Sequence, residues 1–169
     1  MKIHSPHAPR DMSELMAQAY ALEREAVDRY GELADVLATH NNQEVAALFR
    51  RLASQEALHA AEILRTMGWT RAPQPGALPE APEAPTIEDA HYLMHPWHAL
   101  RMALDAEQRA HDFFGVLAER CDEDAMRHAA EQLQADEREH IVLLEAWLQR
   151  VPEPPAGWDD DPDPPRYPH

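Results

Sequence analysis

Four stretches of the sequence repeat apolar residues at helical spacing, and in each one a glutamate occupies a position on the apolar stripe. These residues are Glu23, Glu56, Glu107 and Glu137. Burying an isolated ionised carboxylate is very costly, so four of them in one core require positive charge between them. Two divalent metal ions would supply four positive charges against four negative ones. The pattern therefore predicts helices packed around a metal site.

The predicted helices lie between proline-rich segments and short loops. Most of the fifteen prolines fall within residues 73–96 and 152–168, which leaves long stretches that favour helices. We expect helices over about 13–39, 44–67 and 96–121, and from the loop at 121–124 to about 151. Short loops join the helices in pairs, whereas the Pro-rich segment 71–86 is a long crossover. This order predicts an all-α fold, a ferritin-like antiparallel four-helix bundle with a long crossover between helices 2 and 3.

Composition sets the expected domain organisation and excludes several functions. We expect one bundle domain over residues 1–151 and a disordered Pro- and Asp-rich tail over 152–169. A net charge of −16 argues against binding nucleic acids and anionic membranes. No apolar run is long enough to span a membrane, and the N-terminus has no apolar segment typical of a signal peptide. With a single cysteine, the chain has no CxxC metal motif, and we expect a cytoplasmic protein.

The spacing of the four glutamates gives a separate indication that they meet. In an antiparallel hairpin, residues equally far from the turn lie at the same height. The midpoint of Glu23 and Glu56 falls at the first loop, and the midpoint of Glu107 and Glu137 falls at the second. Each hairpin is therefore expected to bring its two glutamates level with each other.

Two histidines extend the predicted ligand set, because His59 and His140 each follow a stripe glutamate in a Glu-x-x-His motif. Residues three apart are neighbours on one helical face, so both motifs suit metal binding. Chance alone gives roughly one such motif in a chain of this composition. A third copy, Glu88 and His91, has no level partner and lies on no long apolar stripe. We therefore expect it to bind no core metal.

Local motifs resemble those of a known family over roughly residues 13–150. Glu23 to Tyr30 is similar to the Glu-x6-Tyr of rubrerythrins and bacterioferritins, and Glu107 to Phe114 repeats it with phenylalanine. Asp136 to His140 resembles the last-helix motif of bacterioferritin. The resemblance implies that Glu23 and Glu107 are terminal ligands and that Glu56 and Glu137 bridge the two metals. It also implies that His59 and His140 each bind one metal. Asp136 and Gln55 would orient these histidines.

The sequence departs from the rubrerythrin pattern in two ways. The tail has no cysteine, whereas rubrerythrins commonly carry a rubredoxin domain. Ala110 occupies the position of an additional glutamate that is implicated in peroxide turnover, and the neighbouring His111 is either a substitute or a half-exposed histidine. Tyr30 has three interpretations: a hydrogen-bond donor to a ligand, a residue oxidised near the metals, or a core tyrosine.

Oxygen and imidazole ligands favour two iron ions per chain, with manganese as the alternative. The leading hypothesis is a rubrerythrin-like di-iron oxidoreductase that reduces peroxide or dioxygen, or oxidises ferrous iron. Because the chain has no cysteine pair, its electrons would come from a separate donor protein. We expect a homodimer. The alternatives are iron storage in a ferritin-type cage and di-iron hydroxylation of a small substrate.

Overall fold

The computed structural model describes residues 11–73 and 95–157, which form four helices and no strand. The helices are α1 (Met12–Thr39), α2 (Gln43–Met67), α3 (Pro96–Arg120) and α4 (Asp124–Arg150). The all-α prediction is confirmed, and each boundary agrees with its predicted position to within about a residue. Most of the tail, and most of the crossover, lies outside the described residues. None of the described helices is long and apolar enough to cross a membrane.

Local sequence signals explain where the helices begin and end. The side chain of Asp11 accepts a hydrogen bond from the backbone N–H of Glu14, which caps α1. Gly68 ends α2 with a φ of 68°, a left-handed conformation that glycine adopts without a steric penalty. Pro96 opens α3, where its missing N–H is not needed. Asn41 adopts a positive φ in the loop between α1 and α2.

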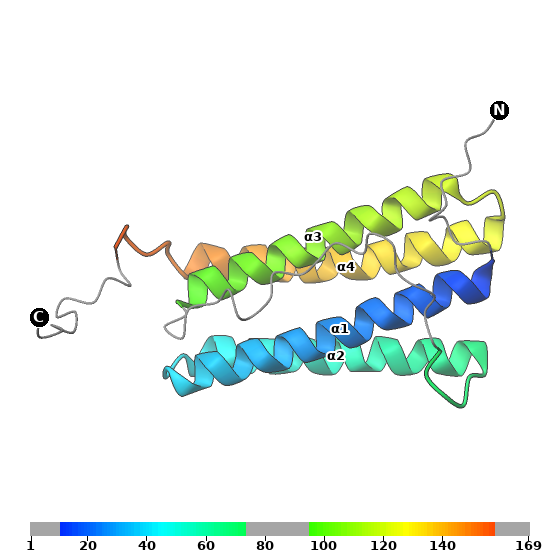
Figure 1. Ribbon diagram of the computed structural model, residues 1–169. Helices are drawn as coiled ribbons and strands as arrows, with labels where there is room; N and C mark the ends of the chain where they lie inside the picture. Colours follow the sequence, from blue (N-terminus) through cyan, green and yellow to red (C-terminus); the bar gives the residue numbers. More distant parts are fainter. Residues whose placement is uncertain (1–10, 74–94, 158–169) are drawn as a thin grey trace, which may run out of the picture.

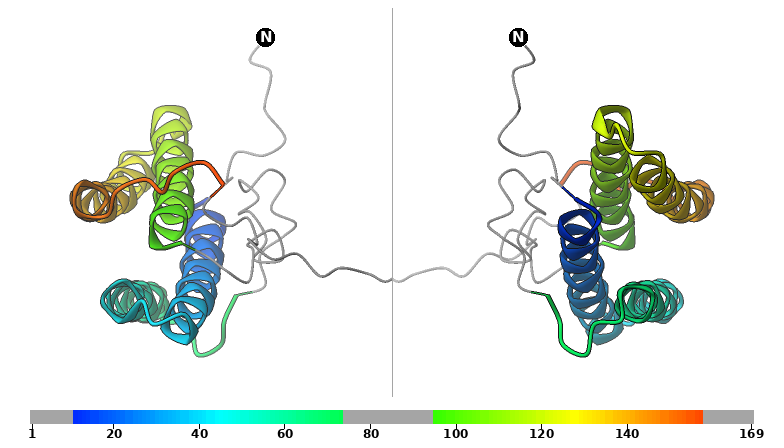
Figure 2. Two further views of the ribbon diagram at one scale, coloured as in Figure 1. Left: turned by 90° about the vertical axis from the view of Figure 1, so that its left-hand side faces the viewer. Right: turned by 90° about the vertical axis from the view of Figure 1, so that its right-hand side faces the viewer.

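The helices form two antiparallel hairpins that lie side by side. Figure 1 shows α1 along α2 and α3 along α4, and the end-on views of Figure 2 show the four helices at the corners of a bundle. α1 and α3 run in opposite directions and form the face nearest the viewer in Figure 1. α2 ends at the opposite end of the bundle from the start of α3, so their connection has to span its length. This arrangement is the predicted ferritin-like topology.

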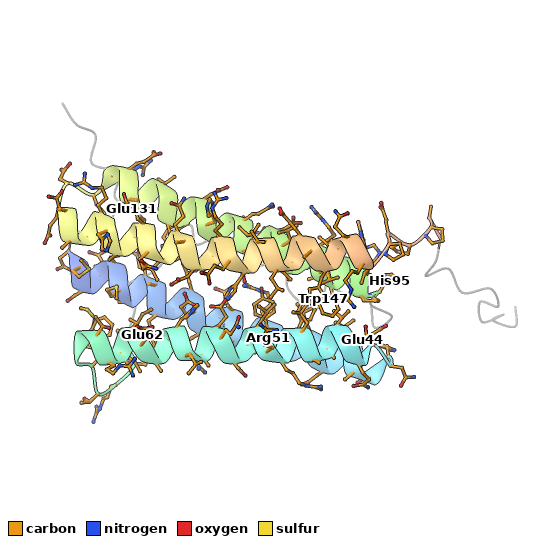
Figure 3. The ribbon with its side chains drawn as sticks, turned by 180° about the vertical axis from the view of Figure 1, so that it is seen from behind. Glu44, Arg51, Glu62, His95, Glu131 and Trp147 are labelled. Carbon is orange, nitrogen blue, oxygen red and sulfur yellow. The ribbon has the colours of Figure 1, made fainter. Side chains whose placement is uncertain are left out.

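The core has two apolar clusters with a polar layer between them. One cluster contains Tyr30, Phe49 and Leu100, and the other contains Leu15 and Phe114, among other residues. Along every helix, the stripe glutamate lies between residues of the first cluster and residues of the second. Figure 3 shows the face formed by α2 and α4, on which Arg51 and Glu62 mark α2, and Glu131 and Trp147 mark α4. The two clusters thus enclose the layer that contains the predicted ligands.

Candidate metal centre

All six predicted ligands converge in this polar layer, one glutamate from each helix and one histidine each from α2 and α4. The four glutamates and His140 are each at most 5% exposed, whereas the side chain of His59 is 27% exposed. Buried carboxylates at this density are not found in an ordinary apolar core. The interior of the bundle is therefore built around these groups.

The ligand atoms form two groups that share one residue. Glu56, Glu107, Glu137 and His140 place one ligand atom each within 4.8 Å of one another, and Glu56 also groups in this way with Glu23 and His59. The shared position of Glu56 is the one a bridging carboxylate would occupy between two ions.

The two imidazoles lie close to the carboxylates and to each other. His140 Nδ1 lies 2.7 Å from Glu56 Oε1, and His59 Nδ1 lies 3.6 Å from Glu56 Oε2 and 3.7 Å from Glu23 Oε2. The two imidazole rings are nearly parallel, with centroids 5.8 Å apart. Glu56 thus has one imidazole beside each of its carboxylate oxygens.

The polar atoms of the site lack the partners that buried groups normally have. Both carboxylate oxygens of Glu23 and of Glu56, and Nδ1 of His59 and of His140, are buried without an aligned hydrogen bond. Nearly all buried polar side chains in folded proteins are hydrogen-bonded, so such a cluster requires an explanation. Metal ions would use these lone pairs as ligands and would neutralise the carboxylates. The residues present therefore fit a pair of divalent ions.

The carboxylates cannot all be ionised when no cation is bound. Burial, together with the neighbouring carboxyl of Glu56, raises the pKa of Glu23 well above its usual value. Burial and the carboxyl of Glu107 do the same to the pKa of Glu137. Burial also acts to raise the pKa of Glu56, but Glu23 and the two histidines outweigh it and lower that pKa. In the metal-free protein, protons take the place of part of the missing positive charge.

The neighbouring glutamates also shift the pKa values of the two histidines. The side chains of Glu23 and Glu56 raise the pKa of His59 to about 10. Burial alone would lower the pKa of His140, but Glu107 and Glu56 raise it to about 10. Both imidazoles are therefore protonated at neutral pH in the metal-free protein, and each must lose its proton to bind a metal ion.

Tyr30 connects the two hairpins at this layer. Its fully buried hydroxyl donates a hydrogen bond to Oε1 of Glu107 on α3. Burial and the nearby charge of Glu107 raise the pKa of Tyr30, which keeps the hydroxyl protonated as a donor. The corresponding position in the second hairpin is Phe114, which has no hydroxyl. Both carboxylate oxygens of Glu23 are without an aligned donor among the described residues. The first and the third interpretation of Tyr30 both describe the structure, since the residue donates a hydrogen bond to a predicted ligand and lies in the apolar core.

The residues predicted to orient the histidines lie next to the cluster. Asp136 is partly buried, and burial raises its pKa while the charges of His59 and His140 oppose that change. Gln55 is partly buried on α2, next to Glu56. No aligned hydrogen bond from either residue to a histidine is present within residues 11–73 and 95–157.

Other residues considered from sequence lie outside the ligand cluster. His111 contacts Asp112 at 3.1 Å and Arg138 at 3.4 Å, and it belongs to neither ligand group. Its side chain is only 17% exposed, so His111 is more buried than the half-exposed interpretation expects, and it lies outside the groups that a substitute ligand would join. Glu88 and His91 lie outside the described residues.

A pocket between α1 and α3 reaches the ligand cluster, and its lining includes two arginines that belong to no sequence motif. Arg29 and Arg109 line it together with Glu23, Glu107 and Glu137. The side chain of Arg29 is only 13% exposed, whereas that of Glu25 is 46% exposed. Arg29 is buried because it faces the pocket that α1 and α3 form together. The available signal was the helical spacing of Leu22, Ala26 and Arg29, which defines a second face.

Comparisons with known proteins give a family and a structural neighbour. Residues 14–148 match the rubrerythrin family. A crystal structure of an uncharacterised conserved protein from Magnetospirillum magnetotacticum MS-1 is similar to this chain, with 35% sequence identity and a TM-score of 0.75. The similarity covers 86% of this chain and 98% of that one. A search of curated proteins finds no match.

Proposed function

The chain belongs to the rubrerythrin family of di-iron, ferritin-like proteins, and from this premise we propose that it is an oxidoreductase. It would reduce hydrogen peroxide or dioxygen, or oxidise ferrous iron, with electrons from a separate donor. The observation that supports the proposal is the cluster of six ligand side chains, in which both carboxylate oxygens of Glu23 and of Glu56 and the Nδ1 atoms of the two histidines have no aligned partner. Hydrogen bonds within a plain structural bundle would have satisfied these atoms.

The proposed ligand arrangement follows the two groups. Glu23 and His59 would hold one ion, and Glu107 and His140 the other. Glu56 would bridge them, since it belongs to both groups. We assign the second bridge to Glu137, which stands at the position in the second hairpin that Glu56 has in the first.

Carboxylates and imidazoles are ligands that suit iron, and manganese remains the alternative. A bound iron pair would supply two electrons by passing between its ferrous and ferric forms. Two divalent ions would also balance the four negative charges of the glutamates, which is the electrostatic requirement that the buried layer imposes.

Neighbouring side chains would hold the ligands in place. The Tyr30 hydroxyl positions the Glu107 carboxylate, because it donates a hydrogen bond to one of its oxygens. We propose that Asp136, whose charge interacts with both histidines, and Gln55, which adjoins Glu56, position the imidazoles. Ala110 lines the pocket beside the centre where related proteins have a glutamate. We therefore expect slower peroxide turnover than in a rubrerythrin with that carboxylate.

The single cysteine and the expected assembly complete the proposal. Cys121 is buried and has no second cysteine to pair with, so the chain contains no thiolate site that could pass electrons to the centre. We propose a separate electron-donor protein and a homodimeric assembly. Light scattering would separate a dimer from the large shell of a storage protein.

The test is stopped-flow absorbance of anaerobically iron-loaded protein mixed with hydrogen peroxide or with dioxygen. We expect oxidation within minutes at two iron ions per chain. Glu56→Gln should lose iron and the reaction, whereas Glu62→Gln, an exposed change on the same helix, should behave as wild type. If neither oxidant reacts although two iron ions are bound, the proposed function is wrong.

A further inference from the structure

The pocket between α1 and α3 has a composition that the metal centre itself does not explain. Its α1 and α3 walls come from residues at helical spacing on each helix, and Glu137 of α4 also lines it. The lining residues other than the metal ligands are small, apolar or charged: Leu22, Glu25, Ala26, Arg29, Ala106, Arg109 and Ala110. Three alanines thus leave space next to the ligands, and two arginines border it.

The arginines have donors without acceptors. Nε of Arg29, and both Nε and one terminal nitrogen of Arg109, are buried and have no hydrogen-bond partner among the described residues. Arg29 has one nearby carboxylate, Glu25 at 3.7 Å, whose side chain is 46% exposed. Within the described part of the chain, Arg109 has no carboxylate within ion-pair distance. A guanidinium has five donors and no acceptor, so these groups need an acceptor from outside.

The size and charge of the pocket define the class of acceptor. Its cavity of about 30 Å³ has room for roughly two or three water-sized groups. Two divalent ions would neutralise the four glutamate ligands. The remaining charged residues of the pocket are two arginines and Glu25, which together carry a net charge of +1. A small monoanion would balance this charge. Its oxygens would also accept hydrogen bonds from the planar guanidinium groups.

We propose that this pocket binds a monoanion of about three non-hydrogen atoms, held by Arg29 and Arg109 beside the metal ligands. The inference rests on the proposed function, because the net charge of +1 assumes two bound divalent ions beside the glutamates that line the pocket. The anion would act as a substrate or an effector of the centre, with formate or nitrite as examples of its size and charge. A neutral molecule with oxygen atoms could accept hydrogen bonds from the arginines, but it would leave the net charge of +1 unbalanced.

Formate is the probe, and zinc-loaded protein is the sample, because zinc fills the site without redox chemistry. Carbon NMR of ¹³C-formate during titration should show saturable binding at the millimolar level, as expected for so small a ligand. Arg29→Gln and Arg109→Gln should each weaken binding about tenfold or more. Arg109→Lys should give an intermediate loss, because it keeps the charge without the planar pair of donors.

Arg24→Gln is the matched control, since Arg24 is exposed on the same helix as Arg29. The inference would be overturned if folded Arg29 and Arg109 variants bound formate as tightly as wild type. It would also be overturned if Arg24→Gln weakened formate binding as much as they do. Zinc content and iron oxidation measured on the same variants separate the two hypotheses. If wild-type protein binds two metal ions and is oxidised normally but does not bind formate, only the anion pocket is refuted. If wild-type protein binds no metal, the proposed function is refuted.

Discussion

Metal loading should release protons, because the pKa shifts at the centre place protons on groups that must become ligands. At pH 7, two ordinary histidines would together carry about half a proton. Here the pKa values of His59 and His140 are both about 10, so each carries nearly a full proton. The raised pKa values of Glu23 and Glu137 add up to two more. Loading two divalent ions should therefore release between about two and four protons per chain.

The same protons give the affinity a pH dependence with a definite sign. Each group with a raised pKa binds a proton that competes with the metal, and this competition weakens as pH rises. Apparent affinity should therefore increase from pH 6 to 9. The two histidines alone predict a gain of about tenfold per ion for each pH unit.

Isothermal titration of the metal-free protein with zinc, in two buffers of different ionisation enthalpy, counts the protons. His59→Gln should lower the count by about one, whereas His128→Gln, an exposed change on α4, should leave it unchanged. Release of fewer than about one proton per chain, or an affinity independent of pH, would refute this account of the buried charges.

Three further outcomes are expected. Removing the metals should lower the melting temperature, and the difference in melting temperature between the two forms should widen from pH 6 to 9. Groups with raised pKa values stabilise the metal-free fold below their unfolded-state pKa and lose that contribution as pH rises. A difference that calorimetry finds constant over this pH range would contradict the prediction. Tyr30→Phe should destabilise the metal-free protein by about 1–3 kcal/mol in urea unfolding, by leaving an oxygen of Glu107 unpaired, and an equal effect of Tyr20→Phe would remove the reason given. Glu88→Ala should keep two metal ions per chain by elemental analysis, and loss of one would mean that the wrong Glu-x-x-His motif was chosen.

The fold was largely predictable because its signals are local. Caps such as Asp11 and Gly68 and the proline-free stretches define the helices, and the loop positions define which glutamates are level within a hairpin. The pairing of the hairpins was predictable only as a topology. No turn sets the register of α1 against α3, so the sequence could not tell which ligand Tyr30 contacts. The burial of Arg29 depends on the same inter-helix contact and was missed for that reason.

The central claim is that two metal ions lie between these six side chains, and anomalous diffraction at the iron edge tests it most directly. Crystals of iron-loaded protein should show two peaks in the buried layer. One should lie between Glu23 and His59, the other between Glu107 and His140, and both within reach of Glu56. A single peak, or iron bound only elsewhere while these side chains hold no ion, would contradict the account.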